Sequence, residues 1–123
     1  MQGVIVLADD DRSMREALAA ALEANGFRVF EAASGKEALE LAAAQTPDAV
    51  VSDVYMPDGN GFDVARAVSQ SGRRVPVILV SGHAEPAVRA AAIAAGASAY
   101  LPKPIGVADL MSALRAALHP EGC

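Results

Sequence analysis

The chain has 123 residues, the size of one ordinary domain and too few for two independent cores. Its 10 Lys and Arg against 15 Asp and Glu give a formal charge of −5, and it has no basic stripe, so we expect no direct binding to nucleic acid. No apolar run approaches the roughly 20 residues of a membrane span, and the first residues lack the basic segment of a signal peptide. The single cysteine, Cys123, cannot form an internal disulfide, which fits a reducing cytoplasm. We therefore expect a cytoplasmic location, and from the lack of a long apolar run no contact with a membrane.

Short apolar runs alternate with helical patterns through the first half of the chain. Val4–Leu7 is a continuous, largely β-branched run, typical of a strand that is buried on both faces. Asn25-Gly26 ends the helical pattern that follows, and a Ser-x-x-Glu capping pattern at Ser34 begins a second helix, which Thr46-Pro47 ends. The predicted elements are strands at 4–7 and 27–30 and helices at 14–22 and 35–44.

The second half continues the alternation. Strands are predicted at 49–51, 75–80 and 99–101, and helices at 62–68, 85–95 and 107–118. Pro76 is expected among the first residues of its strand rather than in its middle. Five strand–helix units without a break in composition imply right-handed crossovers and a parallel sheet with helices on both faces. We therefore predict one α/β domain over residues 1–118, with residues 119–123 as a C-terminal tail or truncation stub.

Polar residues follow four of the five predicted strands. The first strand leads into Asp9-Asp10-Asp11, the third into Asp53, the fourth into Ser81 and the fifth into Lys103. In a parallel α/β sheet, ligands bind outside the carboxyl ends of the strands, at the point where the strand order reverses. We therefore expect these four groups to face one crevice.

The acidic residues suit a hard divalent cation. Adjacent carboxylates repel one another unless a cation is present, and oxygen ligands of this kind favour Mg²⁺ over zinc. A simpler interpretation remains for each acid, because Asp11 or Ser13 could cap the first helix and Asp53 could be a turn residue. Asp58 and Asp63 are better candidates for such local roles.

The hydroxyl and the amine complete the set. Ser81 could be a turn hydroxyl before Gly82, whereas Lys103 lies between Pro102 and Pro104, which hold its backbone extended. An acid pair for Mg²⁺, a carboxylate nucleophile, a hydroxyl and an ammonium are the groups needed to transfer a phosphoryl group onto an aspartate.

Four motifs resemble those of one known family. They are VIVLADDD at residues 4–11, SDVYMPDGNG at 52–61, VPVILVSG at 75–82 and AYLPKP at 99–104. In this order and spacing the chain resembles, over residues 3–118, the receiver domain of the two-component response regulators. The resemblance implies a flavodoxin-like (βα)5 three-layer sandwich with a five-stranded parallel sheet of order 2-1-3-4-5.

The resemblance also implies a site. Asp53 matches the phosphoacceptor, Asp10 a direct ligand of Mg²⁺ (or Mn²⁺), Asp9 a ligand through water, and the Tyr55 backbone carbonyl a further ligand, with Asp53 itself in the metal set. Ser81 and Lys103 match the groups that bind the phosphoryl oxygens. Tyr100 matches the switch aromatic that moves inward when Ser81 is drawn to phosphate.

Three further residues follow from the same resemblance. The Lys103-Pro104 bond matches the family's cis-proline position. Tyr55 and His83 flank the path of the hydrolytic water, so a bulky Tyr55 is expected to slow dephosphorylation, while His83 is more simply a loop residue.

The resemblance implies partners as well. They are a sensor histidine kinase or a histidine phosphotransfer protein, an output domain or target protein that reads the surface of the fourth helix, fifth strand and fifth helix, and a second copy of the chain on phosphorylation. A receiver promotes its own phosphorylation and slow dephosphorylation without being a turnover enzyme.

Two alternatives remain at this point. Asp9-x-Asp11-x-Ser13 is similar to the motif of haloacid-dehalogenase-like phosphatases, with Asp9 as nucleophile and Asp11 as acid/base. That interpretation leaves Asp53 and Lys103 unexplained. The other is a pseudo-receiver, a binding module that never accepts phosphate.

Overall fold

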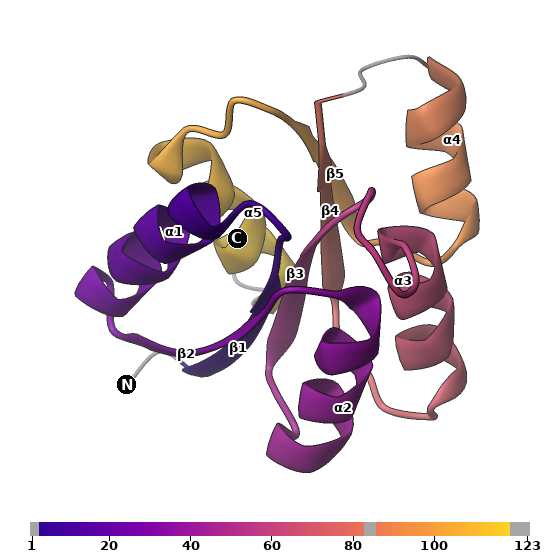
Figure 1. Ribbon diagram of the computed structural model, residues 1–123, viewed down its shortest axis with the longest axis horizontal. Helices are drawn as coiled ribbons and strands as arrows, with labels where there is room; N and C mark the ends of the chain where they lie inside the picture. The colour runs from indigo at the N-terminus through magenta and orange to yellow at the C-terminus, as the bar shows by residue number, and fades with distance from the viewer. Residues whose placement is uncertain (1–2, 83–85, 119–123) are drawn as a thin grey trace.

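Five strands alternate with five helices over residues 3–82 and 86–118, the part of the chain that the computed structural model describes (Figure 1). The elements are β1 (Gly3–Ala8), α1 (Arg12–Ala24), β2 (Phe27–Ala32), α2 (Gly35–Gln45), β3 (Ala49–Asp53), α3 (Gly61–Gln70), β4 (Val77–Ser81), α4 (Pro86–Ala94), β5 (Ala99–Pro102) and α5 (Val107–Leu118). The strands form one parallel sheet of order β2-β1-β3-β4-β5. The predicted flavodoxin-like α/β fold is confirmed.

Alternation along the strands divides the core into two layers. In β1, Ile5 and Leu7 face α1 and α5, whereas Val6 and Ala8 face the opposite side, which α2, α3 and α4 cover (Figure 1). The side chains of β3 and β4 are likewise buried on both faces, which explains the continuous apolar runs in the sequence. Fully buried Leu22 and Leu114 hold α1 and α5 against the sheet.

Several element boundaries differ from those predicted. β4 begins at Val77 and not at Val75, because Pro76 lacks an N–H for the sheet; its carbonyl still accepts a hydrogen bond from the Val50 N–H at 3.0 Å. β2 extends to Ala32, and α3 begins at Gly61, one residue earlier than predicted. The predicted start of the fourth helix, Glu85, lies outside the described residues.

The helix caps account for two of the acids. Asp11 is the N-cap of α1, and its side chain accepts a hydrogen bond from the Met14 N–H at 3.1 Å. Asp63 forms a reciprocal capping box with Asn60 at the start of α3. These two carboxylates therefore have the local roles that the sequence allowed for them.

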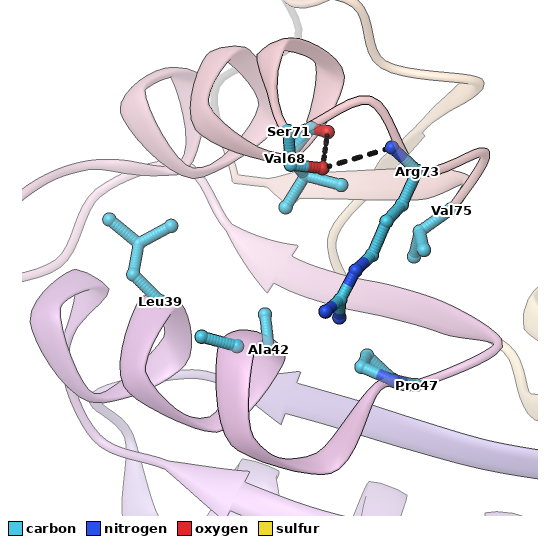
Figure 2. Close-up of a pocket in the computed structure, with 8 residues that line it drawn as sticks. Leu39, Ala42, Pro47, Val68, Ser71, Arg73 and Val75 are labelled. Carbon is cyan, nitrogen blue, oxygen red and sulfur yellow. Dashed lines mark hydrogen bonds between the residues drawn. The ribbon is translucent and has the colours of Figure 1, made fainter.

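An apolar cleft of about 230 Å³ lies between α2 and α3 (Figure 2). Its lining residues are Leu39, Ala42, Ala43, Pro47, Val68, Ser71, Arg73 and Val75. Pro47 precedes β3 and Val75 precedes β4, so the cleft lies at the amino ends of the strands, opposite the edge where the predicted site residues gather. Within the described residues, no helix is both long and apolar enough to span a membrane.

Candidate functional site

The sheet order reverses between β1 and β3, which places the ends of these two strands side by side. Asp9 directly follows β1, and Asp53 is the last residue of β3. Ser81 ends β4, the next strand across, and Lys103 directly follows β5. The four predicted strand-end groups therefore lie along one edge of the sheet, where ligands bind in folds of this type.

Lys103 bridges the two buried carboxylates of this edge. Its Nζ lies 2.9 Å from Oδ2 of Asp53 and 3.2 Å from Oδ2 of Asp9. The side chains of Asp9 and Asp53 are 4% and 9% exposed, and that of Lys103 is 21% exposed. The Lys103 backbone N–H donates to the Ser81 carbonyl at 2.8 Å, so β4 holds the lysine in place.

Asp10 completes an acidic cluster with these two residues. One carboxylate oxygen from each of Asp9, Asp10 and Asp53 lies within 4.8 Å of the others. Oxygen ligands around an octahedral Mg²⁺ lie roughly 3 to 4 Å apart, and this cation prefers carboxylates and retained waters. The three ionised carboxylates face one ammonium, that of Lys103, which contacts Asp9 and Asp53, and this leaves two negative charges for a divalent cation. The donor set therefore fits Mg²⁺.

Burial has the largest effect on the pKa of the Asp53 carboxyl. It raises the pKa of the Asp53 carboxyl above its ordinary value of 3.8, and the charge of Asp9 raises it further. Lys103 and a hydrogen bond from the Tyr55 backbone lower that pKa without offsetting the rise. For Lys103, burial lowers the pKa of the ammonium, but the Asp53 and Asp9 carboxylates outweigh burial and the pKa is raised above 10.5. Lys103 is thus a permanent cation at neutral pH.

Arg15 is a residue of this region that the sequence interpretation missed. Its Nη1 donates to the Asp9 carbonyl at 2.8 Å, and its Nε forms an ion pair with Glu31 at 3.1 Å. The Asp9 N–H donates to the Ala32 carbonyl at 3.0 Å, so both sides of the Asp9 peptide are held. The signal in the sequence was weak: Arg15 lies four residues after the cap Asp11, on the turn of α1 nearest β1.

The remaining candidates occupy different environments. Ser81 is fully buried, while Tyr55, whose backbone donates a hydrogen bond to the Asp53 carboxylate, is about half exposed. Tyr100 is 6% exposed, and the Arg89 guanidinium of α4 lies 5.7 Å from its ring centroid. The Lys103-Pro104 peptide bond is cis. His83 lies outside the described residues.

Comparison with known proteins agrees with this geometry. The family model "Response regulator receiver domain" matches residues 5–115. The chain belongs to the response regulator receiver domain family. Receivers of two-component systems are signalling domains, and the family binds Mg²⁺ at an acidic aspartate cluster.

Individual relatives show the same likeness. The chain is 41% identical over 115 residues to the response regulator MprA of Mycolicibacterium vanbaalenii, covering 94% of this chain and 50% of that protein. It superposes on the receiver domain of the NarL response regulator of Mycobacterium tuberculosis with a TM-score of 0.86 and 34% identity, covering 94% and 95% of the two chains. For the chemotaxis response regulator CheY4 of Vibrio cholerae, the TM-score is 0.88, the identity 29% and the coverage 96% and 100%. The chain thus spans about half the length of the curated relatives it matches.

Removal of the Lys103 ammonium should destabilise the receiver in the absence of metal. In Lys103→Met, two buried carboxylates lose their counter-charge, and we expect the free energy of unfolding to fall by about 3 kcal/mol. Urea denaturation at pH 7, with a chelator to remove metal ions, measures this free energy of unfolding. Lys36→Met, at the exposed second lysine, is the matched control and should unfold like the wild type. Equal stability of the two variants would contradict the prediction.

The raised pKa of Asp53 gives the receiver a pH dependence of defined sign. Because this pKa is higher in the folded chain, ionised Asp53 costs stability above the unfolded pKa, and the cost vanishes where both states are protonated. Metal-free Asp53→Asn should therefore be more stable than the wild type at pH 7, and the difference should shrink towards pH 4. Urea denaturation across this range tests it, with Asp58→Asn, at an exposed acid, as control. A difference that stays constant or grows as the pH falls would be the contrary result.

Proposed function

We propose that the chain is a phosphorelay receiver that accepts a phosphoryl group from a phosphohistidine partner onto Asp53. The contact of the Lys103 ammonium with both Asp53 and Asp9 supports this most directly, because it joins an acceptor carboxylate, a fixed cation and an acidic cluster at one edge. The partner is a sensor histidine kinase or a histidine phosphotransfer protein, and an output domain or target protein reads the result.

The transfer step follows from these groups. A carboxylate oxygen of Asp53 forms a bond to phosphorus as the phosphorus–nitrogen bond of the phosphohistidine breaks, and the leaving imidazole keeps the electron pair. Asp9, Asp10, Asp53 and the Tyr55 carbonyl would hold Mg²⁺, which would supply neutralisation of the charge on the phosphoryl oxygens. Lys103 moves from the Asp53 carboxylate to a phosphoryl oxygen, and the Ser81 hydroxyl donates to another.

The response spreads through neighbouring strands. Phosphorylation adds about two negative charges and strong acceptors at Asp53, which draw the Ser81 hydroxyl towards them. Tyr100 pairs with Leu79 of β4, so a shift at the end of β4 alters the packing around its ring. The surface of α4, β5 and α5 then changes its population between two arrangements, and partners, including a second copy of the chain, read that population.

The phosphatase alternative gains no support from the position of Asp11. That interpretation needs Asp11 as an acid/base, whereas its carboxylate is engaged in capping α1. A slow loss of phosphate from Asp53, without turnover of a separate substrate, is the activity we expect.

Acetyl phosphate with Mg²⁺ should label the wild type with one phosphoryl group, detected as a mass gain of the intact chain. Asp53→Asn should abolish the label, because the acceptor is lost, and chelation of Mg²⁺ should prevent it. Asp58→Asn, in the loop after β3, is the matched control and should be labelled fully.

The same assay separates the alternatives. A label that survives Asp53→Asn and disappears in Asp9→Asn would favour the phosphatase. No label on any variant, with Mg²⁺ present, would identify a pseudo-receiver and end the proposal.

Tyr55 should slow the loss of phosphate. Its half-exposed ring lies two residues beyond Asp53, and we expect Tyr55→Ala to admit water and to raise the dephosphorylation rate about three- to tenfold, a change in barrier of ~1 kcal/mol. The decay of the mass label after removal of acetyl phosphate measures it. Tyr55→Phe keeps the bulk and should decay like the wild type. An unchanged rate in Tyr55→Ala would show that the ring does not hinder water.

A further inference from the structure

Gly35, the first residue of α2, has no room for a side chain. A Cβ built there would lie 2.3 Å from the carbonyl oxygen of Gly59 and 2.7 Å from its carbonyl carbon, where ordinary contact begins near 3.4 Å. The atoms that it would meet are backbone, which cannot rotate away. The segment that crowds Gly35 is residues 54–60, which we call the β3–α3 loop.

Local structure does not explain this glycine. Gly35 lies in a regular helix, its φ is not in the left-handed range, and alanine is favoured over glycine in a helix. Alanine is also abundant here, with 28 in the chain. The requirement for glycine therefore comes from the approach of the loop, whose nearest end, Val54, lies 19 residues further along the chain than Gly35.

The β3–α3 loop is held at both its base and its tip. At the base, Val54 donates its N–H to the Val80 carbonyl at 2.9 Å and accepts from the Gly61 N–H at 2.7 Å. At the tip, the Gly35 N–H donates to the Pro57 carbonyl at 3.3 Å. Asp58 and Gly59 both have positive φ, of 54° and 104°, so the tip has a sharply defined shape. The N-terminus of α2 is thus the support on which the tip rests.

The β3–α3 loop begins directly after Asp53, the proposed phosphoacceptor. Tyr55, its second residue, donates a backbone hydrogen bond to the Asp53 carboxylate, and its carbonyl belongs to the proposed metal set. A tip pushed away from α2 must shift the peptides between its two anchors, and the Tyr55 peptide is one of them. The contact at Gly35 therefore affects the position of the Tyr55 peptide at the site through the short segment of the loop that joins Tyr55 to its tip.

We propose that Gly35 is a positioning residue for the phosphoryl-transfer site. By carrying no side chain, it lets the β3–α3 loop rest on α2, and this contact sets where the loop holds the Tyr55 peptide beside Asp53. The inference rests on the proposed function, because it assumes that the acidic cluster and the Tyr55 carbonyl bind Mg²⁺.

The test is the Mg²⁺ affinity of Gly35→Ala in the full chain, measured by calorimetry at a temperature where circular dichroism shows it folded. We expect binding about tenfold weaker than in the wild type, the low end of the effect of changes around metal ligands. Gly106→Ala adds the same methyl before α5, where only the flexible Asp109 carboxylate lies at 3.3 Å, and should bind normally. Leu114→Ala, in the core beneath α5, controls for lost stability alone and should also keep its affinity.

The outcomes separate this inference from the function beneath it. Wild type that binds Mg²⁺ and accepts phosphate, together with Gly35→Ala of unchanged affinity, would overturn the inference and leave the function intact. Equal weakening in Leu114→Ala would also overturn it, because stability alone would then explain the loss. Wild type without Mg²⁺ binding would overturn both. Should Gly35→Ala fail to fold, Ser34→Ala, which uncaps α2 without adding bulk, should weaken binding about two- to threefold, and normal binding there would refute the inference.

Discussion

The repulsion among Asp9, Asp10 and Asp53 is the constraint on which the site depends. Folding brings three carboxylates within 4.8 Å while one ammonium, that of Lys103, faces two of them. Such an arrangement is unfavourable in the absence of a further cation. The pKa of Asp53 is raised, chiefly by burial and to a smaller extent by the charge of Asp9. The cluster persists because the sheet fixes the strand ends, and the same excess of negative charge makes the edge receptive to a divalent ion.

Apolar packing on both faces of the sheet stabilises the fold and offsets the repulsion within the acidic cluster. β1, β3 and β4 are buried on both faces, with α1 and α5 packed on one side and α2, α3 and α4 on the other. Parallel pairing of β1 with β3 and of β3 with β4 fixes the spacing between Asp9, Asp53 and Ser81. The charged edge thus rests on apolar packing that does not depend on it, which is why substitutions at Lys103 or Asp53 should change stability without abolishing the fold.

The order of the elements could be predicted because it follows from local patterns, such as the run Val4–Leu7 and the capping pattern at Ser34. The convergence of Asp9 and Lys103, 94 residues apart, was also predictable, since all carboxyl ends of parallel strands share one edge. The residues that hold the site in position could not be predicted in this way. Arg15 acts on the backbone carbonyl of Asp9, and Gly35 acts on the backbone of the β3–α3 loop, so the role of each residue depends on how a helix packs against another segment. Interactions of this kind leave no periodic trace, so only the coordinates reveal them.

Lys103 connects the acidic cluster to the rest of the molecule. It touches Asp53 through its ammonium and β4 through its backbone N–H, and it directly follows β5, the strand that carries Tyr100. A phosphoryl group at Asp53 would compete with Asp9 for this single ammonium, and any shift of Lys103 would act on both β4 and β5. Because Arg89 of α4 lies over the Tyr100 ring, a change at β5 would reach α4. In the proposed switch, this one shared cation would therefore couple the charge at Asp53 to the α4, β5 and α5 surface.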